Sequence, residues 1–140
     1  MTLKGRNAIV TGSTAGIGLG MALALAKAGA DVVLHARGPH LHAMQERGLR
    51  VLSPDGDFEV TPVATGDLGS VGRADVVFLS VKAHSLTTLA PSLPPLLGPD
   101  TVVVSTQNGI PRWYFQVGGG ELAGLRLERV DPGGVIADTT

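Results

Sequence analysis

A glycine-rich segment near the start of the chain constrains the fold most strongly. Residues 11–18 read Thr-Gly-Ser-Thr-Ala-Gly-Ile-Gly and follow a short apolar run at 7–10. A stretch dense in Ala and Leu comes next, and Gly29 ends it before a second apolar run at 30–36. This order predicts strand, tight loop, helix and second strand, the unit that holds a dinucleotide in open α/β folds. The alternative is a glycine-rich turn in an α/β protein without a ligand.

Each glycine of this loop has its own expected role. Gly12 lets the chain turn sharply off the strand, Gly16 leaves room for a pyrophosphate, and Gly18 lets the helix lie close to the sheet. The helix, expected over 17–28, then directs its unpaired N–H groups and its positive end at the anion. The expected pyrophosphate contacts are Gly12, Ser13, Thr14, Gly16, Ile17 and Gly18. The expected buried stripe of the helix is Ile17, Met21, Ala24, Leu25 and Ala28.

Arg37 stands just past the second strand, about 20 residues beyond the glycine loop, where NAD-selective folds usually carry Asp or Glu for the ribose 2′-hydroxyl. An arginine at this position suits a 2′-phosphate instead. We therefore predict NADP(H) rather than NAD(H) as the cofactor. The alternative is a solvated arginine in a turn.

The rest of the chain predicts a doubly wound parallel sheet. Two continuous apolar runs, at 74–81 and 100–105, are typical of central parallel strands covered on both faces. The other expected elements are a helix at 39–47, a hairpin of 49–52 with 58–63, a loop at 65–73, an irregular helix at 85–97, a short helix at 111–115 and a last strand at 125–130. We expect an α/β fold of three layers, Rossmann-like, with strand order 3-2-1-4-5 and right-handed crossovers.

Composition limits the function classes. With 140 residues we expect one domain, and without cysteine there are no disulfides or thiolate metal sites. A net charge of −1 and no basic block argue against nucleic acid, and no apolar run is long enough to predict a membrane span. A cytoplasmic protein is expected. Only 16% of the residues are charged, which predicts an exposed apolar face that pairs with another domain or with a second copy.

Two families are similar to different parts of the chain. The Gly-x-x-x-Gly-x-Gly spacing, the preceding Thr11 and most of residues 1–36 resemble the N-terminus of short-chain dehydrogenases/reductases. Residues from about 31 to 138 resemble the cofactor domain of ketopantoate reductases (2-dehydropantoate 2-reductases). The second resemblance is carried by Arg-Gly-Pro-His at 37–40, Val-Lys-Ala at 81–83 and Gln-Asn-Gly at 107–109.

The chain also departs from both families. A ketopantoate reductase carries Gly-x-Gly-x-x-Gly in its first loop, and a short-chain dehydrogenase carries Asn-Ala-Gly and a Tyr-x-x-x-Lys pair. Here Lys82 follows the fourth strand, and Tyr114 is followed four residues later by Gly118. We therefore predict a hybrid, natural or engineered, whose two parts join near residues 31–38.

The second resemblance implies a place in catalysis for two residues. Lys82 and Asn108 would lie near the nicotinamide end of the cofactor, and the parent reaction is the NADPH-dependent reduction of 2-dehydropantoate to pantoate. In that family a lysine acid and a glutamate belong to a C-terminal helical domain, which we expect these 140 residues to lack, so we expect cofactor binding without turnover. The alternatives are a surface lysine at a strand end and, for Asn108-Gly109, an ordinary turn.

Three hypotheses stay open from the sequence. The first is an NADP(H)-binding domain of the ketopantoate reductase type. The second is a chimeric fold that binds no ligand usefully, and the third is a truncated short-chain dehydrogenase. The histidines give no metal-ligand pattern, and we expect solvent-exposed or structural roles for all four: His35, His40, His42 and His84.

Overall fold

The computed structural model describes residues 2–13, 16–52, 54, 56–117 and 119–140. Its strands are β1 (Asn7–Thr11), β2 (Asp31–His35), β3 (Leu49–Val51), β4 (Phe58–Val60), β5 (Val63–Thr65), β6 (Val76–Leu79) and β7 (Val102–Ser105). Its α-helices are α1 (Gly16–Lys27), α2 (Gly38–Arg47), α3 (Ala83–Leu89) and α4 (Tyr114–Val117). Four 3₁₀ turns complete the structure: η1 (Leu68–Ser70), η2 (Ala90–Ser92), η3 (Pro94–Leu96) and η4 (Pro132–Gly134).

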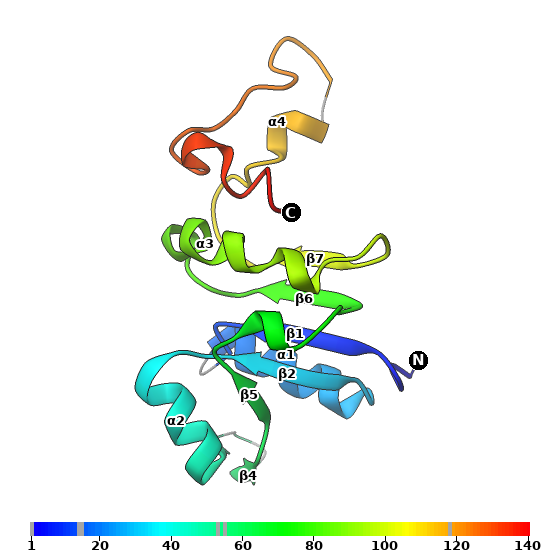
Figure 1. Cartoon of the computed structure of the whole chain (residues 1–140), viewed down its shortest axis with the longest axis vertical. Helices are drawn as coiled ribbons and strands as arrows, with labels where there is room; N and C mark the ends of the chain where they lie inside the picture. Colours follow the sequence, from blue (N-terminus) through cyan, green and yellow to red (C-terminus); the bar gives the residue numbers. More distant parts are fainter. Residues whose placement is uncertain (1, 14–15, 53, 55, 118) are drawn as a thin grey trace.

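Five parallel strands form the central sheet in the order β5-β2-β1-β6-β7, visible from bottom to top in Figure 1. Counted along the chain within this sheet, the order is 3-2-1-4-5, so the predicted Rossmann-like topology is confirmed. The chain runs outward from β1 in one direction and then crosses to β6 on the other side of β1. The gap between β1 and β6 is therefore the topological switch point, where open α/β sheets bind their ligands.

Apolar side chains cover both faces of the sheet. Val10 and Leu34 pack with residues of α1 and α2 on one face, and Ile9 and Val77 pack with α3 and the turns that follow it on the other. The central strand β1 contributes to both cores, because its Ala8, Ile9 and Val10 have no exposed surface. This continuous apolar run is what a parallel strand buried on both faces requires. The expected three layers are confirmed.

Thr11 fastens the carboxyl end of β1 to β6. Its hydroxyl donates to the carbonyl of Phe78 at 3.0 Å and accepts from the N–H of Ser80 at 3.1 Å. The side chain is fully buried, and both of its hydrogen-bonding functions are satisfied inside the protein. The loops that leave β1 and β6 therefore start from a fixed geometry.

The buried face of α1 differs from the predicted stripe. Ile17 is 66% exposed and Ala24 is exposed, whereas Gly18 and Ala22 are buried and Leu25 packs into the core. The apolar pattern could not identify the face, because every residue of this helix except Lys27 is apolar or glycine. The smallest residues, spaced four apart, decide which side comes close to the sheet.

The expected single strand at 58–63 is two strands. β4 pairs antiparallel with β3, as predicted for the hairpin, but β5 lies in the central sheet beside β2. Pro62 separates them, since proline has no N–H to continue the β-ladder. The third strand of the main sheet therefore ends at Thr65, where the sequence predicts the start of a loop.

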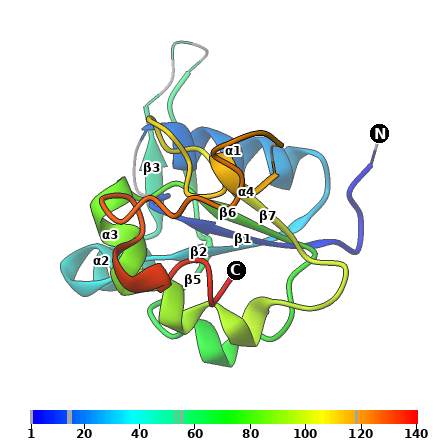
Figure 2. The same cartoon turned by 90° about the horizontal axis from the view of Figure 1, so that it is seen from above.

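The last third of the chain is less regular than predicted. The prolines of 85–97 reduce the expected helix to α3 and two 3₁₀ turns, and the expected strand at 125–130 is absent, since those described residues lie in turns and coil. The carboxylate of Asp131 instead accepts the N–H groups of Ile136 and Ala137 at 2.8 and 2.9 Å. This bond pair shapes a terminal turn, and Ile136 from this turn is buried in the same core as Leu86 and Leu89 of α3. Figures 1 and 2 show this end of the chain from two sides.

Candidate cofactor site

The glycine loop between β1 and α1 has two closely packed glycines and one open one. A Cβ on Gly12 would lie 2.7 Å from the carbonyl oxygen of Ser80, and one on Gly18 would lie 2.5 Å from the carbonyl of Gly12. Gly16 has a φ of +62° and nothing within 4 Å of its ideal Cβ position. The predicted division of roles fits this geometry, because the turn and the helix packing exclude side chains while Gly16 faces free space.

The neighbours of these glycines present their main chain to that space. Ser13 is fully buried, so a ligand on the open side of the loop meets its backbone rather than its hydroxyl. Ile17 is exposed in the first turn of α1. Thr14 lies outside the described residues. The main-chain N–H groups of a first helical turn have no partner within the helix, which is the usual basis of anion binding.

Two buried hydroxyl groups beside the loop have unused hydrogen-bonding capacity. In the described part of the chain the Oγ atoms of Ser13 and Ser80 have no hydrogen-bond partner. Ser80 lies beneath the first turn of α1, where its Cβ is 3.1 Å from the ideal Cβ position of Gly18. Unpaired buried polar groups are rare in proteins and call for an explanation such as a functional site or a bound water.

A cavity of about 160 Å³ opens beside this loop at the switch point. It is lined by Gly12 from the end of β1, Val81 from the end of β6, and His35, Ala36, Arg37 and His40 from the end of β2 and the start of α2. Arg37 is exposed and is the N-cap residue of α2, with an extended backbone. The structure therefore brings Arg37 and Gly12, 25 positions apart in sequence, to one cavity.

His35 forms the buried wall of this cavity. Its side chain is almost fully buried, and this burial lowers the pKa of the imidazole below 6.5, with the positive charge of Arg37 acting in the same direction. A hydrogen bond with the main chain of Gly66 opposes this shift. The net direction favours the neutral imidazole, so Arg37 carries the fixed positive charge of the cavity.

Lys82 and Asn108 occupy equivalent places after neighbouring strands. Lys82 follows β6 as the N-cap residue of α3, Asn108 follows β7, and both are exposed. Gln107, which the sequence analysis did not single out, connects the two segments: its side-chain amide donates to the carbonyl of Val81 at 3.1 Å. The sequence feature that could have pointed to Gln107 is its position next to Asn108, just after a strand.

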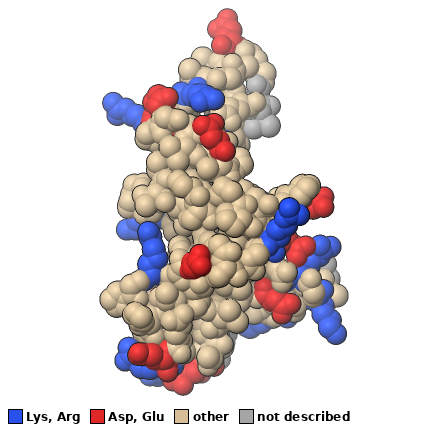
Figure 3. Space-filling view, viewed as in Figure 1, with Lys and Arg blue, Asp and Glu red and all other residues tan. Residues whose placement is uncertain are grey.

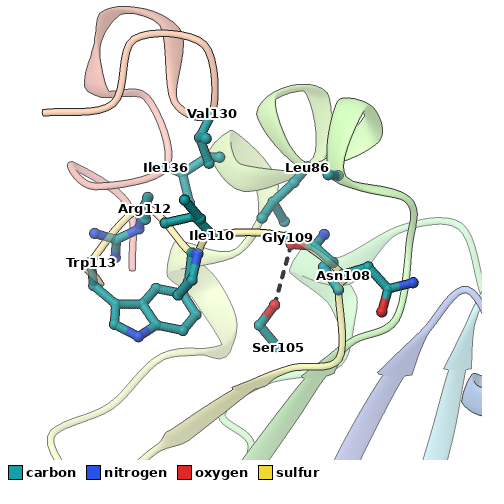
Figure 4. A pocket seen from close by; sticks show the side chains of 12 residues that line it. Leu86, Ser105, Asn108, Gly109, Ile110, Arg112, Trp113, Val130 and Ile136 are labelled. Atoms are coloured by element: carbon teal, nitrogen blue, oxygen red, sulfur yellow. Dashed lines mark hydrogen bonds between the residues drawn. The ribbon is translucent and has the colours of Figure 1, made fainter. Parts of the chain in front are cut away.

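A smaller cavity of about 40 Å³ lies next to Asn108 and is drawn in Figure 4. Ser105 and Gln107 provide polar atoms, joined by a hydrogen bond of 3.2 Å from the hydroxyl to the amide oxygen. Leu86, Ile110, Trp113 and Ile136 make the rest of the lining largely apolar. This cavity lies at the end of β7, beyond the switch point.

Charge and apolar exposure are unevenly distributed. Figure 3 shows lysines, arginines and acidic residues scattered over the drawn face, with broad areas that carry neither. Several large exposed apolar side chains belong to the segment after Asn108, among them Ile110, Tyr114, Leu122 and Leu125.

No helix in the described part of the chain has the length and hydrophobicity that a membrane crossing requires. Among the same residues, no three His, Cys, Asp or Glu side chains gather as a metal site would need.

A parallel five-stranded sheet with a glycine loop at its switch point and polar residues along its carboxyl edge defines a Rossmann-like α/β domain. The sequence profile described as ketopantoate reductase PanE/ApbA matches residues 9–112. The chain belongs to the ketopantoate reductase family.

Relatives of known sequence or structure support this membership. A 2-dehydropantoate 2-reductase of Mesorhizobium japonicum is 49% identical over 107 residues, which cover 76% of this chain and 32% of the relative. A crystal structure from Ralstonia solanacearum, of a protein assigned to the ketopantoate reductases, is 39% identical with a TM-score of 0.86, covering 96% of this chain and 41% of that one. D-mandelate dehydrogenase in complex with NADH and anilino(oxo)acetate is 25% identical with a TM-score of 0.67, covering 76% of this chain and 34% of that one.

The matches cover most of this chain and a smaller part of its relatives. The chain spans about a third of the length of the curated relative from Mesorhizobium japonicum. The family match also begins at residue 9 and so includes the glycine loop as well as the predicted seam near 31–38. The comparisons thus support one ketopantoate reductase domain, and they give no support for a short-chain dehydrogenase segment.

Proposed function

We propose that this chain binds NADP(H) across the carboxyl edge of its sheet. The pyrophosphate lies on the glycine loop, the 2′-phosphate beside Arg37, and the nicotinamide toward β6 and β7. The proposed contacts are Gly12, Ser13, Thr14, Gly16, Ile17 and Gly18 for the pyrophosphate, Arg37 for the 2′-phosphate, and Lys82 and Asn108 for the nicotinamide end. The observation that carries the proposal is the cavity at the switch point, which Gly12 and Arg37 line together.

The residues present fit such a ligand. The free space at Gly16 is where a phosphate approaches a helix N-terminus, and Gly12 and Gly18 hold the loop in a compact turn. The guanidinium of Arg37 offers paired donors that match two oxygens of a phosphate monoester. The related D-mandelate dehydrogenase structure contains NADH, so a nicotinamide dinucleotide is a ligand within this fold family.

We propose further that the parent reaction is the reduction of a 2-oxo acid, as the name 2-dehydropantoate 2-reductase of the relative states. NADPH supplies the hydride for this reaction, and the ketone oxygen needs a proton from a positioned acid. Lys82 and Asn108 contribute at the nicotinamide end. We propose that these 140 residues bind the cofactor without completing the reduction by themselves. Oxidation of NADPH by the chain alone in the presence of ketopantoate would contradict this.

Calorimetric titration with NADPH and NADH tests the cofactor assignment. We expect the wild-type chain to bind NADPH more tightly than NADH, and Arg37→Ala to lose most of that difference, on the order of tenfold or more. Arg47→Ala is the matched control, because Arg47 lies in the last turn of the same helix, is also exposed and does not line the cavity. Its affinity for both dinucleotides should equal that of the wild type.

Absence of dinucleotide binding would favour the hypothesis of a chimeric fold that binds no ligand usefully. If neither dinucleotide binds while circular dichroism shows a folded chain, the sequence has kept the fold and lost the site. Equal affinity for NADPH and NADH would instead remove Arg37 from its proposed role and leave the pyrophosphate site in place.

We infer that the protein is a homodimer, in which the exposed apolar side chains after Asn108 pair with a second copy. We propose a cytoplasmic location. Sedimentation equilibrium checks this inference, and a monomer at high concentration would contradict it. A hybrid origin with a join near residues 31–38 stays a proposal carried by the Gly-x-x-x-Gly-x-Gly spacing alone. Natural homologues that contain both halves in one chain would overturn it.

A further inference from the structure

The cavity beside Arg37 contains more hydrogen-bond donors than one arginine provides. Three of its lining side chains carry nitrogen: His35, Arg37 and His40. None of the described residues that line it carries a carboxylate, and the first turn of α2 has no acidic residue. The lining therefore favours an anion, and it offers that anion more than one partner.

The two histidines of the cavity differ in position. His35 is the last residue of β2 and almost fully buried, whereas His40 is exposed in the first turn of α2, three residues after Arg37. Pro39 precedes His40, and a proline in the first turn restricts the backbone there to a helical conformation. His40 is thus held at the mouth of the cavity, and His35 forms its inner wall.

We propose that His40 is a second contact for the 2′-phosphate of NADP(H), beside Arg37, and so a determinant of the preference for NADP(H) over NAD(H). This inference rests on the proposed function. A phosphate monoester has three terminal oxygens, and a guanidinium engages two of them in its bidentate geometry. The imidazole of His40 lines the same cavity, and its N–H can bind an oxygen that Arg37 leaves free.

The neighbouring histidine provides a matched control. His42 lies on the same helix and is exposed like His40, but it does not line the cavity. A general electrostatic effect of histidines on α2 would make His40 and His42 equivalent. A direct contact distinguishes them.

The test uses calorimetry with 2′,5′-ADP and 5′-AMP, two nucleotides that differ only in the 2′-phosphate. We expect His40→Gln to weaken 2′,5′-ADP binding on the order of tenfold, the scale of a lost charge-assisted hydrogen bond, and to leave 5′-AMP binding unchanged. His40→Lys keeps an N–H donor at this position and should retain most of the affinity. His42→Gln should match the wild type. Both substituted positions are exposed, and circular dichroism checks that each of the three variants folds.

Three results would overturn the inference. If His40→Gln binds 2′,5′-ADP as tightly as the wild type while Arg37→Ala does not, His40 has no role and the proposed function stands. If His42→Gln loses as much affinity as His40→Gln, the effect is not a contact. If the wild type does not prefer 2′,5′-ADP to 5′-AMP, both the inference and the NADP(H) assignment fail.

Discussion

The side-chain amide of Gln107 donates a hydrogen bond of 3.1 Å to the main-chain carbonyl of Val81. The bond joins the segment after β7 to the segment after β6. Asn108 directly follows Gln107, and Lys82 directly follows Val81, so one side chain fixes the two main-chain segments that carry the proposed nicotinamide contacts. The hydroxyl of Ser105 donates to the same amide at 3.2 Å and orients it.

We predict that Gln107→Leu weakens NADPH binding several-fold and lowers the free energy of unfolding by about 1 kcal/mol, the usual contribution of one such hydrogen bond. Binding of 2′,5′-ADP should stay unchanged, since that nucleotide lacks the nicotinamide end. Calorimetry and urea unfolding measure the two effects.

Gln45→Leu is the control for this variant, because the Gln45 amide makes the same kind of bond, 3.0 Å to the carbonyl of Ala64, away from β6 and β7. It should lose similar stability and keep NADPH affinity. If Gln107→Leu weakens 2′,5′-ADP as much as NADPH, Gln107 acts on the whole site rather than on its nicotinamide end.

Substitution of the loop glycines should separate folding from binding. Gly16→Ala places a methyl group in open space at a φ of +62°, which costs about 1 kcal/mol of strain in the folded state. The same methyl group occupies the proposed phosphate position, so we predict a folded protein whose NADPH affinity falls at least tenfold, on the order of 1.4 kcal/mol. Thermal unfolding and calorimetry provide the two measurements.

Gly20 is the control for this substitution. It lies inside α1, has nothing within 4 Å of its ideal Cβ position and has no left-handed backbone. Gly20→Ala should therefore stabilise the protein by about 0.5 to 1 kcal/mol and leave binding unchanged.

Gly12→Ala should destabilise the protein by about 2 to 4 kcal/mol, since its Cβ would meet the Ser80 carbonyl. Normal NADPH affinity in Gly16→Ala would contradict the proposed phosphate position.

The sequence was sufficient to predict the elements whose local signals agree with their surroundings. The glycine spacing at 12, 16 and 18 and the long apolar runs of the central strands have one physical explanation each, and the structure contains the elements they predict. The position of Arg37 near the glycine loop was predictable, because its distance from that loop along the chain places it just after β2.

Elements that depend on distant contacts were not predictable in this way. β5 has three residues, and only its pairing with β2 makes it part of the main sheet. The buried face of α1 depends on how closely Gly18 approaches Gly12, which a helix made almost entirely of apolar residues and glycine does not encode. Gln107 bonds to Val81, and His40 lines a cavity together with Gly12, and both of these neighbours are far away in sequence.

Asp75 should make folding stability depend on acid pH. The N–H of Asn7 donates to its carboxylate at 2.8 Å and Arg6 pairs with it at 2.6 Å, and these bonds lower its pKa below 3.8. The unfolded chain therefore binds a proton before the folded chain does as the pH falls. The stabilising contribution is present above the unfolded pKa of 3.8 and is lost as the pH falls through the lower folded value.

We predict that Asp75→Asn is less stable than the wild type at neutral pH and that the difference shrinks below pH 3.8. Urea unfolding over a range of pH measures it. Arg6→Gln should reduce stability less than Asp75→Asn, because the bond from Asn7 is the larger cause of the shift. A difference that is constant across acid and neutral pH would contradict the assignment.

His35 should make folding stability depend on pH in a higher range than Asp75 does. Burial and the charge of Arg37 lower its folded pKa below the unfolded value of 6.5, so in acid the unfolded chain takes up a proton that the folded chain resists. The contribution of His35 to the free energy of unfolding is therefore complete above pH 6.5. It falls as the pH drops toward the folded pKa. We predict that the free energy of unfolding of the wild type decreases between about pH 7 and 5 and that His35→Gln flattens this slope.

The wild-type chain also allows a direct measurement, because an NMR titration of the His35 ring reports its folded pKa without any substitution. A midpoint at or above 6.5 would contradict the predicted direction, even if His35→Gln proves too unstable to study. A midpoint below it means that His35 is neutral at neutral pH, so that Arg37 supplies the standing positive charge opposite a 2′-phosphate.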